Sequence, residues 1–221
     1  MNISAFTKSY DGHTVLDMQN FSLQDGKITV VIGANGSGKS SLARVLSGIE
    51  RTDQNKTLLT GVSIGFMPQK SYAFRMSTLR NIMLNGKNTE HAVKLMKELQ
   101  LESLSRRQAK NLSGGETEKM ALCRLLMGRY DVLILDEPTA AMDMQSTLAA
   151  EKLIVDCCRE TCCTTLLITH SIQQAHRIAD YILYLQEGRL LEQGNAEQIL
   201  SQPKEKGTKQ FLDFYGIRIS E

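Results

Sequence analysis

The sequence has no apolar run long enough to cross a lipid bilayer. Its longest candidates, Ile28–Ile32 and Val132–Leu135, stop at Gly33 and Asp136, whereas a membrane-spanning helix needs roughly 20 apolar residues. The segment Met1–Tyr10 also lacks the basic start and apolar stretch of a secretory signal. We therefore expect a protein that spans no membrane and stays in the cytoplasm.

The sequence also has little net charge. It carries 26 Lys and Arg against 24 Asp and Glu, a formal net charge of +2, and only Arg106 and Arg107 stand together among the scattered basic residues. Proteins that bind nucleic acid usually gather basic side chains on one face. We therefore expect no nucleic-acid partner.

Cysteine is scarce, but its distribution is uneven. Of five cysteines, most crowd into one short segment, as Cys157, Cys158, Cys162 and Cys163. The crowding raises the alternative of a zinc site. However, the usual C-x-x-C spacing is missing, and neighbours on a helix point about 100° apart instead of converging as tetrahedral ligands must. Because cysteine commonly serves as a small buried apolar residue, we favour a structural role.

The apolar pattern alternates short runs with longer periodic stretches, which is typical of an α/β protein with a largely parallel sheet. The pattern predicts strands at Met1–Phe6, Ile28–Ile32, Ser63–Met67, Val132–Leu135, Thr165–Thr169 and Tyr181–Gln186. It predicts helices at Lys39–Ser47, Glu90–Leu99, Gly115–Met127, Gln145–Arg159 and Ile172–Ala179.

The chain is expected to form one domain, residues 1–221, because 42% of its 221 residues are hydrophobic, enough for one substantial core. The strand pattern disappears between Lys70 and Asn111, which predicts a helical insertion over 70–111. The polar composition after Ser201 predicts a loose tail over 201–221.

A phosphate-binding pattern follows the first apolar run. The segment matches G-x-x-x-x-G-K-[ST] in full, with the residues Gly33, Ala34, Asn35, Gly36, Ser37, Gly38, Lys39 and Ser40. Glycines let the backbone wrap around phosphates, and the N–H groups at the start of the following helix supply a positive field. Lys39 is expected to reach the β- and γ-phosphates and Ser40 to bind Mg²⁺. The pattern therefore predicts a site for a nucleoside triphosphate.

An acidic pair ends another apolar run. Asp136 and Glu137 follow Val132–Leu135, at the carboxyl end of a strand, where open α/β sheets bind ligands. Taken alone, such a pair also fits a solvated turn or a helix cap. Beside the phosphate-binding loop, we expect Asp136 to join the Mg²⁺ shell and Glu137 to orient or deprotonate the attacking water.

A histidine ends a third apolar run. His170 follows the predicted strand Thr165–Thr169, so a parallel sheet would bring it to the edge that carries Ser40 and Asp136. A lone histidine at a strand end is usually structural. At this edge we expect His170 to hydrogen-bond the γ-phosphate.

The segment Leu112–Glu116 lies between the helical insertion and the next helix. Ser113, followed by Gly114, Gly115 and Glu116, fits a helix N-cap. The same segment also makes a second corner that can bind an anion. The spacing alone leaves both alternatives open.

Together these motifs resemble the nucleotide-binding subunits of ABC (ATP-binding cassette) transporters along nearly the whole chain. Gly33–Ser40 is similar to the Walker A loop, Val132–Asp136 to Walker B and Leu112–Glu116 to the signature sequence. Further matches are Tyr10 to the adenine-stacking aromatic, Gln69 to the Q-loop glutamine, Glu137 to the catalytic glutamate, Asp143 to the D-loop aspartate and His170 to the H-loop histidine.

The resemblance implies a P-loop NTPase core with a mostly parallel sheet, a small antiparallel β-subdomain and a helical subdomain. It implies that ATP and Mg²⁺ are bound, with Ser41 joining the nucleotide-binding residues, Gln69 joining the metal ligands, and Lys39, Glu137 and His170 acting in hydrolysis. The cassette would form a homodimer or pair with a related ATPase subunit, so that Ser113, Gly114 and Gly115 of one copy close on the ATP of the other.

The resemblance also implies partners. The surface around Gln69 and the helical insertion would receive the permease, placing the chain on the inner face of the cell membrane. A separate motor chain favours import, with an extracytoplasmic solute-binding protein as a further partner. The alternative is a soluble ABC ATPase of translation or DNA repair; such proteins usually have two cassettes or a long coiled-coil insertion, which this sequence lacks.

The sequence departs from the family in a few places. After Glu116 it reads Thr117-Glu118-Lys119, where many relatives carry glutamine and arginine, and the D-loop reads Ala140-Ala141-Met142-Asp143. The stretch from Ser47 to Gly65 is short, which predicts a trimmed antiparallel arm near the adenine. None of these departures removes a catalytic group.

Overall fold

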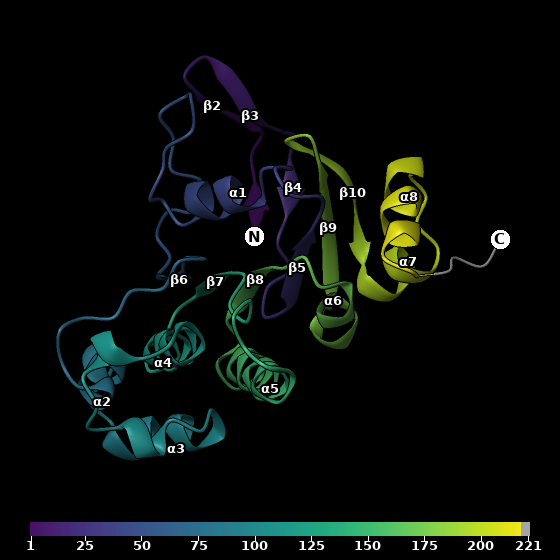
Figure 1. Cartoon of the computed structure of the whole chain (residues 1–221). Helices are drawn as coiled ribbons and strands as arrows, with labels where there is room; N and C mark the ends of the chain where they lie inside the picture. The colour runs from purple at the N-terminus through teal and green to yellow at the C-terminus, as the bar shows by residue number, and fades with distance from the viewer. Residues whose placement is uncertain (218–221) are drawn as a thin grey trace.

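A computed structural model describes residues 1–217 and contains a central six-stranded sheet in the order β10-β9-β5-β8-β7-β6 (Figure 1). All neighbouring strands are parallel except β10, which pairs antiparallel with β9. The strands are β5 (Ile28–Ile32), β6 (Ile64–Met67), β7 (Val132–Asp136), β8 (Thr164–Ile168), β9 (Tyr181–Gln186) and β10 (Arg189–Asn195). This is the predicted α/β class. No helix among residues 1–217 is long and apolar enough to cross a membrane.

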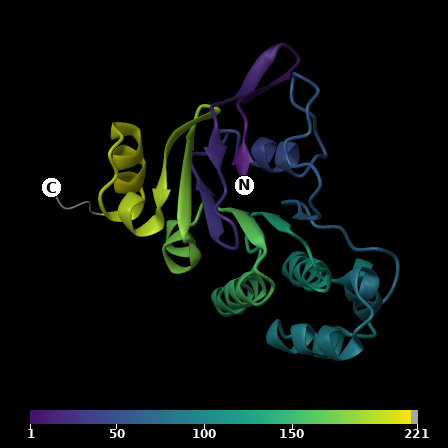
Figure 2. The same cartoon turned by 180° about the vertical axis from the view of Figure 1, so that it is seen from behind.

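Both faces of the sheet are covered, which explains why its central strands are apolar without alternation. Neighbouring residues of β5 and β7 point to opposite cores: Val30 and Leu133 belong to one core, Val31 and Ile134 to the other. Helix α1 (Lys39–Leu46) and the N-terminal strands cover one face, whereas α4 (Gly114–Leu126), α5 (Met144–Thr161) and α6 (Ile172–Ile178) cover the other (Figures 1 and 2).

The N-terminal segment forms short antiparallel pairs: β1 (Asn2–Ile3) with β4 (Phe21–Ser22), and β2 (Phe6–Tyr10) with β3 (His13–Met18). The prediction of one strand over Met1–Phe6 was wrong. The chain leaves the β1–β4 pair after Ile3, and the Ala5 N–H donates to Asn20 Oδ1 at 2.7 Å instead of continuing that ladder. The alternation of polar and apolar residues across this break made two strands look like one.

The segment 70–111 is helical, as predicted. It contains α2 (Thr78–Ile82), α3 (Thr89–Glu98) and the short 3-10 helices η1 (Met83–Asn85), η2 (Glu102–Leu104) and η3 (Ala109–Asn111). Asn81 is fully buried and ties the segment together by donating to the carbonyls of Phe74, Met76 and Ser77 at 3.1–3.3 Å. Helices α2 and α3 project from the sheet beyond α4 and α5 (Figure 2).

The C-terminal segment is folded where a loose tail was predicted. Helix α7 (Ala196–Ser201) is followed by α8 (Lys206–Phe214), whose Phe211 and Leu212 are buried in the main core. The Phe211 ring lies 5.1 Å from that of Tyr184 in β9. Burial of the apolar face of α8 therefore stabilises a helix in this segment despite its polar composition. Residues 218–221 of the predicted tail lie outside the described residues.

Candidate nucleotide site

The predicted site residues lie at one edge of the sheet. In the parallel register, Met67 pairs with Leu135, Asp136 with Ile168, and Ile168 with Val31. The segments that follow these strands therefore leave the sheet at the same edge. The edge brings together the residues that follow β5, β6, β7 and β8, namely Gly33–Ser40, Gln69, Asp136 with Glu137, and His170.

The loop Gly33–Gly38 needs glycine at its two ends. Gly33 has φ 154°, and a Cβ there would lie 2.2 Å from the carbonyl oxygen of Leu185. Gly38 has φ 96°, and its Cβ would lie 2.7 Å from the Leu16 side chain and 3.1 Å from the Val15 oxygen. Both positions combine a left-handed backbone with close approach to a neighbouring strand, so only glycine fits.

Lys39 is held inside the loop by its own backbone. Its ammonium group donates to the carbonyl oxygens of Gly33 and Ala34, both at 2.8 Å, and the residue is only 6% exposed. Burial lowers the pKa of Lys39, and the charges of Glu137 and Asp136 act in the opposite direction. A buried cation surrounded by backbone carbonyls is suited to exchange them for phosphate oxygens.

The Ser37 hydroxyl is a second polar group of the loop that a phosphate could bind. The Ser37 hydroxyl is buried and makes no hydrogen bond within residues 1–217. A buried hydroxyl without a partner costs about 1–3 kcal/mol. The loop thus fits a phosphate ligand, which offers acceptors of the kind that this hydroxyl and Lys39 need.

Ser40 and Asp136 are in direct contact. The Ser40 hydroxyl donates to Asp136 Oδ1 at 3.1 Å across the junction of α1 and β7. Asp136 is 2% exposed, and burial raises the pKa of its carboxyl, while the Ser40 hydrogen bond partly offsets this effect. A hydroxyl and a carboxylate in this arrangement present hard oxygen ligands of the kind that Mg²⁺ prefers.

We expect Asp136→Asn to raise the melting temperature of the nucleotide-free protein at pH 7 by about 2–4 °C. The folded protein penalises an ionised Asp136, because burial raises its pKa. That penalty disappears as pH falls and the carboxyl becomes protonated, so the advantage of the variant should shrink toward about pH 4. Melting curves measured across this range check the expectation; a variant that is less stable at pH 7 would contradict it.

Glu137 and His170 form the next contact along the edge. His170 Nδ1 lies 3.1 Å from Glu137 Oε2. A carboxylate can only accept, so the Nδ1–H must donate. The Glu137 backbone adopts a left-handed conformation, with φ 50°, and its N–H donates to the Ile168 oxygen at 2.9 Å. The strained turn directs the carboxylate to the edge beside the exposed ring of His170.

Tyr10, the last residue of β2, lies beside α1 and the segment that follows it. Its hydroxyl donates to Glu50, and Lys8 Nζ lies 4.9 Å from its ring centroid. Burial raises the pKa of the Tyr10 phenol, and Glu50 adds to this effect, while a hydrogen bond with Ser41 opposes it. Tyr10 and Ser41 therefore lie together at the start of α1, beside the phosphate-binding loop.

The signature segment begins α4 and, in the described part of the chain, does not contact the phosphate-binding loop through Ser113. Ser113 accepts from the Glu116 N–H at 3.3 Å, and Glu116 accepts from the Ser113 N–H at 2.7 Å, which confirms the predicted N-cap. Within residues 1–217, Ser113 makes no hydrogen bond to the phosphate-binding loop of its own chain. Both Ser113 and Gly114 are exposed, so a ligand from outside the chain can reach them.

The model of the ABC transporter family matches residues 16–140. The chain belongs to the ABC transporter family. It is 38% identical over 207 residues to the tungstate uptake system ATP-binding protein TupC of Peptoclostridium acidaminophilum, covering 87% of this chain and 97% of that protein. It is 30% identical over 224 residues to the aliphatic sulfonates import ATP-binding protein SsuB 1 of Streptomyces avermitilis, covering 96% and 82%.

The fold agrees with solved cassettes. The dimeric post-hydrolysis structure of the ATP-binding cassette MJ0796 bound to ADP and Pi superposes with a TM-score of 0.77 at 22% identity, covering 89% of this chain and 99% of that one. The family model and the relative TupC identify the protein as an ATP-binding subunit of the ABC family and an ATPase.

The turn after β7 is supported by a network that the sequence did not predict. Glu151 of α5 accepts from Arg177 Nε and Nη2 at 2.7 and 2.6 Å and from Gln174 Nε2 at 3.1 Å. The same Gln174 amide group donates to the Thr139 hydroxyl at 3.1 Å. This network, in which Glu151 and Gln174 are buried and Arg177 is exposed, fastens the turn after Glu137 to α5 and α6. No local motif marks it, because its members meet only when both helices pack on the sheet.

The cysteines serve the packing of α5. Cys158 and Cys163 are buried, and the Cys158 thiol donates to the Cys163 oxygen at 3.1 Å. Within residues 1–217, no group of His, Cys, Asp and Glu is arranged to hold a metal ion. The thiols of Cys158 and Cys163 therefore fill the core between α5 and β8, as expected of a structural role, whereas Cys162 is exposed.

Proposed function

We propose that this chain is the ATP-driven motor of an ABC importer, acting on the inner face of the cell membrane. The proposal rests chiefly on the convergence of Lys39, the Ser40–Asp136 pair and the Glu137–His170 pair at one sheet edge. The names of TupC and SsuB 1 support import, since both are described as uptake or import proteins.

In hydrolysis, each group has a separate role. Lys39 and the loop N–H groups bind the β- and γ-phosphates, and Tyr10 stacks on the adenine beside Ser41. Ser40, Asp136 and Gln69 would hold Mg²⁺, which when bound supplies positive charge to the phosphate oxygens. Glu137 orients the attacking water, and His170, which holds the Glu137 carboxylate, hydrogen-bonds the γ-phosphate.

The site is incomplete in one copy. Within residues 1–217, Ser113 makes no hydrogen bond to the phosphate-binding loop, and the capped N-terminus of α4 offers the anion-binding N–H groups of Gly114 and Gly115 to an external ligand. We propose that two copies, or this copy and a related subunit, pair head to tail, so that Ser113 of each closes on the ATP of the other.

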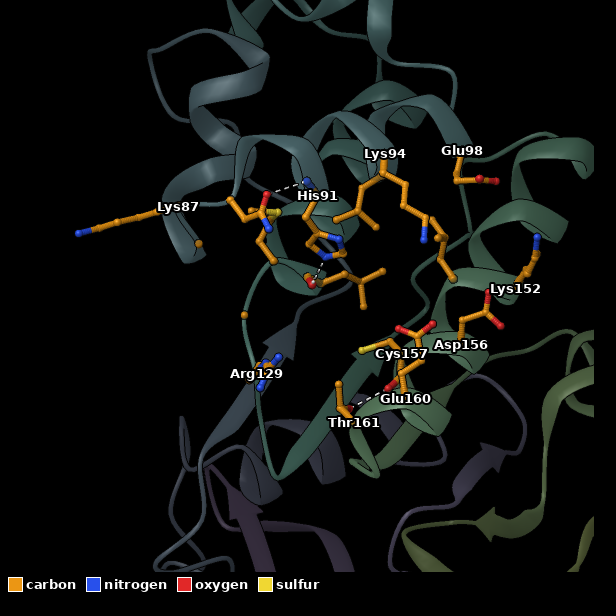
Figure 3. A pocket seen from close by; sticks show the side chains of 17 residues that line it. Lys87, His91, Lys94, Glu98, Arg129, Lys152, Asp156, Cys157, Glu160 and Thr161 are labelled. Atoms are coloured by element: carbon orange, nitrogen blue, oxygen red, sulfur yellow. Dashed lines mark hydrogen bonds between the residues drawn. The ribbon is translucent and has the colours of Figure 1, made fainter.

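We further propose that the permease binds in a groove at the helical subdomain. This groove encloses about 490 Å³ between α3 and α5, and Figure 3 shows the side chains of His91, Lys94, Lys152 and Cys157 converging around it. His91 Nε2 lies 3.3 Å from the Leu126 oxygen, so the groove floor links α3 to the end of α4. Basic and acidic side chains border it together, which suits a short amphipathic cytoplasmic segment of a membrane protein.

The test is a tagged pull-down from gently solubilised membranes, comparing the wild type with Lys94→Glu/Lys152→Glu. Both lysines are exposed at the groove, so we expect unchanged ATPase activity but loss of the co-purifying permease by about tenfold or more, as for a charge reversal within an interface. Lys56→Glu/Lys209→Glu, which reverses two exposed lysines outside the groove, is the matched control.

The proteins that co-purify distinguish a transporter motor from a soluble ATPase. A stoichiometric polytopic membrane protein would support the motor role, and a solute-binding protein beside it would support import. Because TupC is a tungstate uptake protein, we propose an oxyanion as cargo, and ligand binding by the recovered solute-binding protein tests it. Recovery only with ribosomes, nucleic acid or soluble factors would overturn the transport proposal in favour of a soluble ABC ATPase.

A further inference from the structure

Glu118 is a buried carboxylate with no role in the chemistry above. It lies in the second turn of α4 and is 9% exposed. Its Oε2 accepts a hydrogen bond from the Ala141 N–H at 2.9 Å, in the D-loop. Burial raises the pKa of Glu118, while the Ala141 hydrogen bond opposes this effect and the charge of Glu137 adds to it.

The start of α4 lies directly against the D-loop. A Cβ on Gly115 would lie 2.6 Å from the Ala141 oxygen, so the backbones approach as closely as glycine allows. Lys119 Nζ lies 4.0 Å from Asp143 Oδ2. Glu118 thus lies at the centre of a contact between the signature helix and the turn that begins at Glu137.

The Ala141 amide is the donor that the turn itself leaves unused. Within the turn, the Ala140 N–H donates to the Glu137 oxygen at 3.3 Å and the Met142 N–H to the Thr139 oxygen at 3.1 Å. Among residues 1–217, the amide between them, that of Ala141, donates to the side chain of Glu118. The other side of the turn is fastened by Gln174 through Thr139. The turn that begins at Glu137 is therefore held by a hydrogen bond on each side, from Gln174 to Thr139 and from Ala141 to Glu118.

We propose that Glu118 is a positioning residue that connects the signature helix to the Glu137 turn through Ala141. This inference rests on the proposed paired cassettes, in which Ser113 of a copy touches the partner's nucleotide while Glu137 of the same copy acts on its own. Closure at Ser113 then moves α4, and the Glu118–Ala141 hydrogen bond carries that displacement to Glu137. Glu118 is thereby a connection between the two ATP sites.

The test compares Glu118→Met, which keeps the side-chain length but removes the acceptor, with Glu118→Gln, which keeps an acceptor oxygen. Glu102→Met places the same change at an exposed glutamate remote from the D-loop and serves as control. For Glu118→Met we expect kcat to fall about tenfold, KM for ATP to stay within about twofold, and the Hill coefficient for ATP to drop toward one. Glu118→Gln should restore kcat to within about twofold of the wild type.

Hydrogen exchange at residues 139–143 gives a readout independent of turnover. In Glu118→Met the Ala141 amide should exchange faster, while the melting temperature stays close to that of the wild type. If the wild type hydrolyses ATP cooperatively and Glu118→Met matches it in kcat and Hill coefficient, the inference is overturned. If Glu118→Gln is as impaired as Glu118→Met, positioning through the acceptor oxygen is overturned. A wild type without ATPase activity would instead overturn the proposed function itself.

Discussion

Glu137→Gln is expected to bind ATP with wild-type affinity, within about threefold, while kcat falls by about 100-fold or more, the range for loss of a general base. Glutamine has nearly the shape of glutamate, and its amide oxygen can still accept from His170 Nδ1, 3.1 Å from the present carboxylate oxygen. It cannot take a proton from water. Phosphate release at steady state and binding of labelled ATP measure the two quantities separately.

The control is Glu102→Gln. Glu102 is an exposed glutamate in η2 of the helical segment, so it makes the same exchange outside the residues gathered at the sheet edge. Turnover of this control should stay near that of the wild type. Unchanged hydrolysis in Glu137→Gln would assign the catalytic carboxylate elsewhere.

Lys39→Ala is expected to weaken ATP binding about 100-fold, or roughly 2.7 kcal/mol. In the nucleotide-free protein the ammonium group donates to the Gly33 and Ala34 oxygens. When ATP binds, it would donate to the phosphate oxygens instead, a charge-assisted hydrogen bond that alanine cannot make. The melting temperature of the nucleotide-free protein should not fall. Burial lowers the pKa of Lys39 because it disfavours the charged ammonium form, so removing that group does not destabilise the fold. Isothermal titration with ATP and thermal melting check both expectations.

Lys56→Ala is the control for this variant, because Lys56 is exposed and outside the phosphate-binding loop. It removes one positive charge without removing a phosphate ligand, so it reports the long-range effect of charge alone. Equal ATP affinity in Lys39→Ala and the wild type would mean that the phosphates bind elsewhere.

Elements with a strong local pattern were predicted well, and those whose form depends on a distant partner were not. The apolar run Ile28–Ile32 forms β5 with the predicted bounds, because a strand buried on both faces must be apolar throughout. The segment Met1–Phe6 was wrongly predicted as one strand. The chain passes from one sheet to another at Ala5, whose N–H donates to the side chain of the distant Asn20. Helix α8 was missed, because its buried face is defined only by the surface it packs on.

The sequence by itself predicted which residues meet at the site and the chemistry proposed for them. Gly33–Ser40, Asp136, Glu137 and His170 each follow a recognisable apolar run, and parallel strands must release them at one edge. Local order along the chain suffices for this, since each residue's position is fixed by the strand that precedes it.

Only the tertiary structure decided how these residues are held. Lys39 is bound by carbonyls of its own loop, Thr139 by a network from two later helices, and Ala141 by Glu118. These contacts join residues far apart in the sequence, and their hydrogen bonds depend on distances of about 3 Å that packing alone establishes. The sequence names the residues proposed to react, whereas the packing of α4, α5 and α6 places the turn that begins at Glu137.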